Sequence, residues 1–238
     1  MVASGEFTVV KAILLGDPGV GKTSILCRMH SDGLLPAYNS ASYPTIGQEF
    51  TSRSYRDGTL KLQLWDTCGV GHSHGLTRSY YRGTNIGVVV HDAAIPNYEA
   101  VGRWMERLIQ LRVLVEPRAD DPCRRTNQFC VAVVANKIDA ICRHSGPQLG
   151  TMRDYVEDRF SAQLSELGAS LHFYECSAKT NEGVMELFED LMTRNTWSTA
   201  LMPGDRKGSV RLPTGDVPIH RRPNNSDAPA TGMWGCQC

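Results

Sequence analysis

The chain has 238 residues, of which 41% are hydrophobic, and this suits one folded domain of ordinary size followed by a tail. Its 25 basic residues are balanced by 25 acidic ones, so the overall charge gives no reason to expect a nucleic-acid partner. No basic segment followed by an apolar one opens the chain, and no apolar run approaches roughly 18 residues. We therefore expect an intracellular protein with neither a signal peptide nor a transmembrane helix.

Short apolar runs alternate with helical patterns along most of the chain. Apolar runs predict strands at 9–15, 86–90, 129–135 and 171–175, and a hairpin predicts two more, at 48–55 and 60–65. Apolar residues at helical spacing predict helices at 24–30, 98–113, 152–167 and 182–194. This alternation is typical of an α/β fold, and we predict a mostly parallel six-stranded sheet with helices on both faces.

A glycine-rich stretch follows the first predicted strand and opens the first helix. It consists of Gly16, Asp17, Pro18, Gly19, Val20, Gly21, Lys22, Thr23 and Ser24. The spacing fits the phosphate-binding loop G-x-x-x-x-G-K-[ST], in which glycines let main-chain N–H groups point at a polyphosphate. In such loops the lysine lies between the β- and γ-phosphates and the next hydroxyl binds Mg²⁺, which assigns these roles to Lys22 and Thr23. An ordinary glycine turn is the alternative.

The next part of the chain is a polar loop followed by a hairpin. Residues 31–47 predict an exposed loop that carries Thr45. The hairpin has a tight turn at the pair Asp57 and Gly58. Its second strand leads to Asp66, an acidic residue in the place where phosphate-loop proteins hold Mg²⁺.

Two more polar motifs come directly after predicted strands. They consist of Asn136, Lys137, Ile138 and Asp139, and of Cys176, Ser177, Ala178 and Lys179. Both lie at the carboxyl edge of the predicted sheet, where open α/β folds bind ligands. For the first motif taken alone, a polar surface turn is the alternative.

The cysteines lack the spacing of a metal site. Those scattered through apolar or motif positions are Cys27, Cys68, Cys130, Cys142 and Cys176. We expect them to be reduced thiols rather than disulfide partners.

The composition sets the domain boundaries. We expect an N-terminal extension at 1–7, the folded domain at 8–195 and a flexible tail at 196–238. The tail is rich in proline, glycine and basic residues, and it has too few large apolar side chains to fold by itself. Within the domain, residues 116–127 resemble a solvated surface insertion.

The phosphate loop, Thr45, Asp66 with Gly69, and the two edge motifs occur in an order that resembles the five guanine-nucleotide motifs of the Ras-like small GTPases. The resemblance covers roughly residues 8 to 195. It implies a switch protein that binds GTP and GDP together with Mg²⁺. The nucleotide-binding set that it implies is Asp17, Pro18, Gly19, Val20, Gly21, Lys22, Thr23, Ser24, Tyr38, Thr45, Gly69, Asn136, Lys137, Asp139, Ser177, Ala178 and Lys179.

For the base, the resemblance assigns a role to each edge motif. Asp139 would accept hydrogen bonds from the N1 and N2 donors of guanine, a pair that adenine lacks. Lys137 and the aromatic Tyr38 would flank the base. Asn136 would brace the loops, and the Ala178 N–H would meet guanine O6.

For hydrolysis, the resemblance implies a catalytic set of Lys22, Thr45 and Gly69. Thr45 and the Gly69 N–H would contact a γ-phosphate that only GTP carries, which would order both switch loops. The Mg²⁺ ligands would be Thr23, Thr45 and Asp66.

Within this superfamily the chain is most similar to the Rab group. The effector-region signature and the segments on either side of the second switch have matches at 46–50, 61–66 and 80–83. Phe50, Trp65 and Tyr80 fall where Rab proteins carry an aromatic triad that effectors contact, with simple packing as the alternative.

The end of the chain resembles the Rab pattern for double geranylgeranylation, at Cys236 and Cys238. Two lipid chains anchor a protein stably where one does not, and a basic spacer suits an acidic membrane surface. The resemblance implies a protein of vesicle and membrane trafficking on the cytoplasmic face of an intracellular membrane, cycling with the cytosol. Its partners would be effectors, an exchange factor and GDP-dissociation-inhibitor or escort proteins.

The chain departs from the family in its second switch. Rab proteins carry a glutamine that orients the attacking water, and here Val70, which cannot form a hydrogen bond, stands in its place. Pro18 adds bulk near the γ-phosphate. His72 and Ser73 replace the usual arginine and phenylalanine, so we expect a looser loop. His72 and His74 could bind a metal, or one could position the water, with solvated histidines as the alternative.

These departures leave two hypotheses of different classes. One is a Rab-like GTPase with slow hydrolysis, and the other is a non-catalytic module that stays bound to GTP and recruits effectors. A metabolic phosphate-loop kinase is disfavoured by Asn136, Lys137 and Asp139 and by the lipid-type tail.

Overall fold

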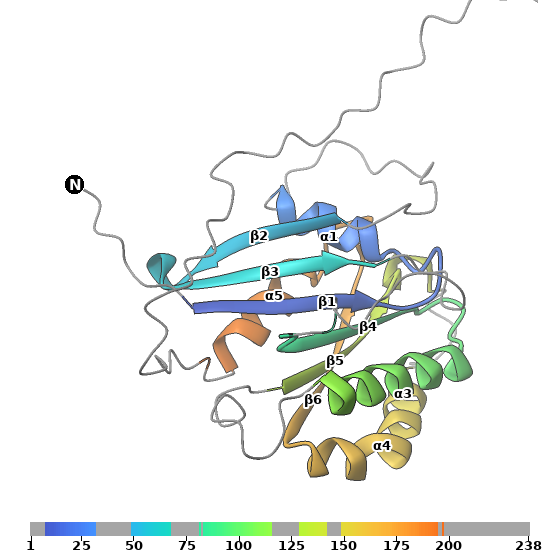
Figure 1. Ribbon diagram of the computed structural model, residues 1–238. Helices are drawn as coiled ribbons and strands as arrows, with labels where there is room; N and C mark the ends of the chain where they lie inside the picture. The colour runs from blue at the N-terminus through green and yellow to red at the C-terminus, as the bar shows by residue number, and fades with distance from the viewer. Residues whose placement is uncertain are drawn as a thin grey trace, which may run out of the picture. The chain divides into compact units, whose positions relative to one another are not determined.

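A computed structural model describes residues 8–31, 49–67, 81, 83–115, 129–141, 149–194 and 197. Six strands form one sheet in the order β2-β3-β1-β4-β5-β6 (Figure 1). They are β1 (Thr8–Leu15), β2 (Glu49–Tyr55), β3 (Leu60–Asp66), β4 (Ile86–Asp92), β5 (Phe129–Asn136) and β6 (Ala169–Cys176). Among these six described strands only the β2–β3 pairing is antiparallel, which confirms the predicted mostly parallel α/β sheet.

Helices cover both faces of the sheet, as predicted. The described α-helices are α1 (Lys22–His30), α3 (Tyr98–Val115), α4 (Leu149–Glu166) and α5 (Val184–Arg194). In Figure 1, α3 and α4 lie together on one side of the sheet, and α1 and α5 lie on the other. Among the described residues, no helix has both the length and the apolar character needed to cross a bilayer.

Strand β1 lies at the centre of the sheet and is buried on both faces. Ala12 and Leu14 belong to the core beneath α1 and α5, whereas Ile13 and Leu15 belong to the core beneath α3 and α4. This explains the continuous apolar run that the sequence shows here, because a parallel strand covered on both sides needs no polar face. The strand that carries the phosphate loop is thereby held rigidly.

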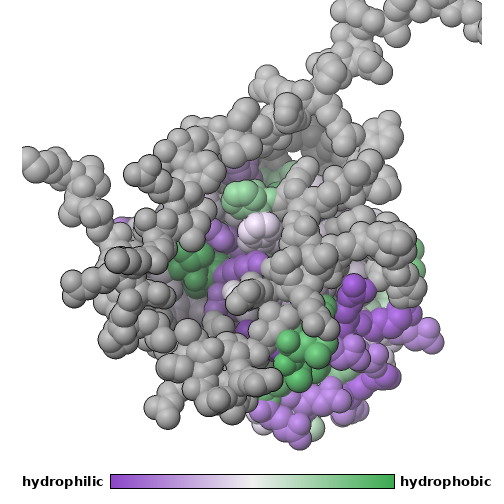
Figure 2. All heavy atoms as spheres, in the orientation of Figure 1, coloured by the Kyte–Doolittle hydropathy of each residue, from purple (hydrophilic) through white to green (hydrophobic). Residues whose placement is uncertain are grey.

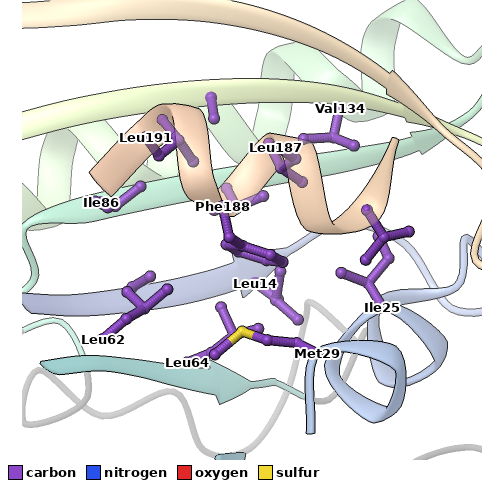
Figure 3. Close-up of a cluster of buried hydrophobic side chains, with 14 of the residues drawn as sticks. Leu14, Ile25, Met29, Leu62, Leu64, Ile86, Val134, Leu187, Phe188 and Leu191 are labelled. Atoms are coloured by element: carbon purple, nitrogen blue, oxygen red, sulfur yellow. The ribbon is translucent and has the colours of Figure 1, made fainter. Parts of the chain in front are cut away.

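The core under α5 is built around Phe188. Figure 3 shows its ring pointing from α5 toward Leu14 of β1, with Ile25 and Met29 of α1 nearby. Phe188 is fully buried, and burying such a side chain contributes about 1.5–3 kcal/mol. This packing ties α1, which follows the phosphate loop, to the last helix of the domain.

The opposite core lies between the sheet and the pair α3 and α4. Met105 and Leu108 of α3 pack there with Phe160 of α4, and all three side chains are at most 1% exposed. The outer side of these two helices is polar. Figure 2 shows hydrophilic residues gathered over the part of the molecule where α3 and α4 lie. α3 is thus fixed beside the carboxyl ends of β1 and β4.

The turn between β2 and β3 lies where the sequence predicts it, at Asp57 and Gly58, with β2 ending at Tyr55 and β3 beginning at Leu60. A short 3₁₀ turn, η1 (Arg56–Gly58), joins the strands, and all three of its residues have positive φ, at 49°, 53° and 85°. The left-handed conformation costs a non-glycine residue roughly 1–2 kcal/mol. Hydrogen bonds offset this strain, since the Thr59 N–H and hydroxyl both donate to Arg56 O, at 3.1 and 2.8 Å.

Three of the described helices begin at other residues than predicted, and one of them, α4, begins at Leu149 rather than at 152. α1 begins at Lys22, two residues earlier, directly at the phosphate loop. α5 begins at Val184 rather than at 182, because Glu182 forms an isolated bridge with Ser177 and its carbonyl accepts the Ser177 N–H at 2.8 Å. That bridge holds the loop after β6 close to its strand.

Three of the predicted thiols lie in the described part of the chain. Cys27, Cys130 and Cys176 form no disulfide with one another in this part of the chain. Burial raises the pKa of the Cys176 thiol to about 12, so this sulfur stays protonated and unreactive at neutral pH. Cys68 and Cys142 lie outside the described residues.

His91 gives the domain a pH dependence. It is 5% exposed, and its Nε2 is buried without a hydrogen-bond partner. Burial lowers its pKa below 6.5, against a weaker opposing effect of Asp92. Below pH 6.5 the imidazole is therefore protonated in the unfolded chain before it is protonated in the folded protein. The free energy of unfolding falls as the pH falls through this range.

We expect His91→Phe to remove this dependence. The slope attributable to the residue is at most about 1.4 kcal/mol per pH unit below the unfolded pKa and zero well above it. Urea unfolding of the parent and the variant at pH 7.5 and pH 5.5, with nucleotide at fixed excess, measures the difference. Equal losses of stability in both proteins on acidification would contradict the assignment.

Candidate functional site

The phosphate loop connects β1 to α1 and depends on Gly21. This residue precedes α1 with a φ of 99°, and a Cβ added to it would lie 2.2 Å from Asn136 Nδ2. Only glycine therefore allows Asn136 to approach the loop. Because α1 begins immediately afterwards, the N–H groups of its first turn, which have no acceptor within the helix, favour an anion at the loop.

Lys22 carries the positive charge of the loop. Its side chain is 6% exposed, and Nζ donates to Gly16 O at 2.8 Å and to Asp17 O at 2.9 Å. The ammonium group is therefore held across the loop by main-chain carbonyls. In this position it can balance the negative charge of a phosphate group bound by the loop.

Asp17 faces α3. Its Oδ1 accepts a hydrogen bond from Trp104 Nε1 at 2.8 Å, and its Oδ2 lies 3.9 Å from Arg103 Nη2. Trp104 is 5% exposed and the Asp17 side chain is 36% exposed, so the bond is partly shielded from water. The sequence placed Asp17 in the nucleotide-binding set but gave no indication of this link to α3. Asp17 contributes its main-chain carbonyl to Lys22 and uses its side chain to fix the loop.

Thr23 and Asp66 meet beside the loop. The Thr23 hydroxyl donates to Asp66 Oδ2 at 2.5 Å, and Asp66 is fully buried at the end of β3. A hydroxyl oxygen next to a carboxylate is the hard oxygen set that suits Mg²⁺, so these residues fit the expected ion. The next residue, Thr67, is fixed by donating to Leu14 O at 2.6 Å. Across the described residues, no cluster of three His, Cys, Asp or Glu side chains could hold a metal.

Asn136, the last residue of β5, connects two loops, the phosphate loop and the loop after β6. Its Nδ2 donates to Val20 O at 2.8 Å, and its Oδ1 accepts the Ala178 N–H at 3.0 Å. The Cys176 thiol lies 3.6 Å from the same oxygen. Asn136 is 1% exposed, so these bonds form in a dry environment and each is costly to leave unmade. This geometry gives Asn136 the bracing position that the sequence predicts for it.

Asp139 is positioned by the loop after β6. Its Oδ1 accepts the Ser177 hydroxyl at 2.6 Å, and its Oδ2 lies 3.5 Å from Lys179 Nζ. Ser177 is itself fully buried, and its oxygen accepts the Thr180 N–H at 3.1 Å. The two edge motifs therefore meet as predicted. The Ala178 N–H, expected to meet guanine O6, donates to Asn136 in this structure.

Lys137 is held by an acidic residue that the sequence analysis did not single out. It has a φ of 69°, and its Nζ lies 2.7 Å from Asp92 Oδ2 at the end of β4. The other oxygen of Asp92 accepts the Ala94 N–H at 2.9 Å. The position of Asp92 after a buried apolar run, like that of Asp66, was the signal that could have indicated it.

Two members of the aromatic triad predicted for effector contact, Phe50 and Trp65, lie on the hairpin. Phe50 is 51% exposed and stacks on Trp65, with ring centroids 5.1 Å apart and an interplanar angle of 21°. Lys11 Nζ lies 5.0 Å from the centre of the Trp65 ring. Phe50 is thus not a core residue, although it packs against one neighbour.

Several predicted site residues lie outside the described residues. These are Tyr38, Thr45, Gly69, Val70, His72, Ser73, His74, Tyr80, Cys236 and Cys238. Their roles stay predictions.

Comparisons with known proteins agree with this site. A model of the Ras family matches residues 11–196. Ras-related protein Rab-18 of Caenorhabditis elegans is 32% identical over 218 residues, which cover 90% of this chain and 93% of that protein. The chain belongs to the Rab group of the Ras family of small GTPases. Ras-related protein RABA6b of Arabidopsis thaliana is 32% identical over 187 residues, or 77% of this chain and 69% of that protein. As a Rab-group GTPase the chain has the general activity of the family, a GTP-binding switch in membrane trafficking.

The close approach of Asn136 leads to a prediction for Gly21→Ala. The new Cβ would displace Asn136 from the loop, and we expect nucleotide to dissociate at least about 10-fold faster because a buried hydrogen bond is lost and a positive φ is strained. Release of fluorescent GDP measures this rate.

Gly168→Ala is the matched control. Gly168 has a φ of 63°, but an added Cβ there meets no atom within 4 Å. This variant should lose stability to backbone strain and keep the parent's rate of nucleotide release. Equal rates of GDP release from Gly21→Ala and Gly168→Ala would show that the close contact between Gly21 and Asn136 does not slow nucleotide release.

Proposed function

We propose that this Rab-group protein recognises guanine through Asp139 and hydrolyses GTP slowly without assistance. The observation that carries the proposal is the fixed position of Asp139, whose two oxygens are oriented by Ser177 and Lys179. A carboxylate held in this way can accept from two adjacent donors, and guanine presents such a pair at N1 and N2. Adenine does not, so the site discriminates between the bases.

The phosphates would lie over the loop between β1 and α1. Lys22 supplies the positive charge, and the start of α1 supplies main-chain N–H groups. Thr23 and Asp66 would hold Mg²⁺, which neutralises phosphate charge when it is bound. Thr45 and Gly69 would complete the contacts to the γ-phosphate.

Slow hydrolysis is proposed because the chain lacks the usual means of orienting the attacking water. Phosphoryl transfer relies on positioning and electrostatics, with little covalent chemistry for the protein to perform. Val70 cannot orient a water molecule. Pro18 is exposed on the phosphate loop, where its ring adds bulk in the place that an arginine finger from an activating protein would enter.

Membrane attachment would come from the end of the chain. Prenyl groups on Cys236 and Cys238 would each bury an isoprenoid hydrocarbon chain in the bilayer, and two chains give stable anchoring. The exposed Phe50 on Trp65 offers an aromatic surface for effectors. An exchange factor and a GDP-dissociation inhibitor or escort protein would move the chain between the cytosol and the cytoplasmic face of an intracellular membrane.

A second candidate function is a persistently GTP-bound module that recruits effectors without turning over nucleotide. Val70 is the specific feature that favours it. Both candidates share the nucleotide site, so a direct measurement of hydrolysis separates them.

The decisive variant is Val70→Gln, alone and together with Pro18→Gly. We expect the parent to hydrolyse GTP at or below roughly 10⁻⁴ per second, the scale of unassisted small GTPases. Val70→Gln should raise this rate because it restores a group that can orient water, and the double variant should raise it further. Single-turnover phosphate release at saturating Mg²⁺ gives the rates.

A parent rate 10-fold or more above that scale, or a slower reaction in Val70→Gln, would show that another group positions the water, and His72 would be the candidate. A parent with no measurable turnover over several days would instead favour the persistently bound module.

A further inference from the structure

Arg28 lies in α1, on the side that faces the loop after β6. It is 8% exposed. Its Nε donates to Ala178 O at 2.8 Å, and its Nη2 donates to Lys179 O at 2.7 Å. Both carbonyls belong to the loop whose Ser177 orients Asp139. A buried arginine thus connects the phosphate-binding helix to the base-binding loop, across 150 residues of sequence.

We propose that Arg28 is a positioning residue for guanine recognition, which holds the main chain of residues 177–179 so that Asp139 keeps its orientation. The inference rests on the proposed assignment of Asp139 to the base. It adds a residue that contacts neither base nor phosphate and acts through the loop.

The contacts fix the loop from two sides. The Ala178 N–H donates to Asn136 Oδ1, while the carbonyl of the same residue accepts from Arg28. With both polar groups of Ala178 engaged, the loop cannot rotate without breaking buried hydrogen bonds. The Lys179 carbonyl adds a second bond to the same guanidinium.

The chemistry of this position favours arginine over lysine. The guanidinium is planar and carries its donors in a rigid fork, so two neighbouring carbonyls can be held at once. An ammonium group on a flexible stem can satisfy the same carbonyls only with a less defined geometry. Arg28→Lys should therefore keep the charge and lose part of the positioning.

Arg28 also links the phosphate-binding part of the site to the base-binding part. It follows Lys22 by six residues in the same helix, which corresponds to about 9 Å along the axis. A shift of α1 relative to the phosphates is thereby carried to the loop that orients Asp139. We expect changes in the binding of the phosphates to be accompanied by changes in the binding of the base.

The test compares Arg28→Ala and Arg28→Lys with Arg112→Ala in the full-length chain. Arg112 is also 8% exposed and donates to a main-chain carbonyl, Thr84 O at 3.0 Å, but it lies on α3 with its guanidinium 4.7 Å from the Phe129 ring centre. This control removes a buried arginine away from the nucleotide. Release of fluorescent GDP and of fluorescent IDP, whose base lacks the amino group of guanine, is measured for each protein together with its melting temperature.

We expect Arg28→Ala to release GDP at least about 10-fold faster, because two charge-assisted bonds to the loop are lost. IDP release should change less, so the preference for GDP over IDP narrows. Arg28→Lys should lie between the parent and the alanine variant. Arg112→Ala should lower the melting temperature and leave the GDP to IDP preference at the parent value.

The proposal is overturned if Arg28→Ala and Arg28→Lys keep the parent's GDP to IDP preference, or if Arg112→Ala narrows it as much. Should Arg28→Ala fail to fold, Arg28→Lys against the control decides the matter. A parent that does not bind GDP defeats the proposed function itself, whereas a parent that binds GDP with an unchanged preference in the Arg28 variants defeats only the role of Arg28.

Discussion

The site depends on the buried side chain of Asn136. It is the point at which the phosphate loop, the end of β5 and the loop after β6 are joined, through Val20 O and the Ala178 N–H. Asn136 can approach the phosphate loop because Gly21 has no Cβ. With the amide 1% exposed, losing either bond leaves a buried polar group unsatisfied, which costs about 1–3 kcal/mol. The loops consequently hold their relative positions together.

Around Asn136, hydrogen bonds and ion pairs fix charged side chains at the carboxyl edge of the sheet. Parallel strands deliver Asp66, Asp92 and Asn136 to the same edge, because each is the last residue of its strand. Lys22 is pinned by main-chain carbonyls, and Lys137 is pinned by Asp92. Such preorganisation lets charged groups act on a ligand without first being ordered.

The sheet and the motif residues could be predicted from the sequence, but the side chains that hold the motif residues in place could not. Lys22, Asn136 and Asp139 are recognisable because the chemistry of nucleotide binding restricts which residues can serve and at what spacing. Trp104 and Arg28 belong to helices whose patterns reveal only that a face is buried. Their partners, Asp17 and the loop after β6, are chosen by the packing of distant segments, which no local pattern encodes. The sequence located the turn at Asp57 and Gly58 but not its strained backbone, which is held by the Thr59 hydroxyl on Arg56 O and by Arg56 Nη2 on Met192 O.

The central claim is that Asp139 reads guanine, and Asp139→Asn tests it most directly. The variant keeps an oxygen for Ser177 but replaces the other acceptor by a donor that faces the donors of the base. Dissociation constants for GDP and for xanthosine diphosphate, whose base carries a carbonyl in place of the amino group, are measured for parent and variant. We expect GDP binding to weaken by at least about 10-fold, from an unmatched pair worth about 1–3 kcal/mol, while xanthosine diphosphate binds more tightly. A variant that binds GDP as tightly as the parent would contradict the assignment and the account of the site built on it.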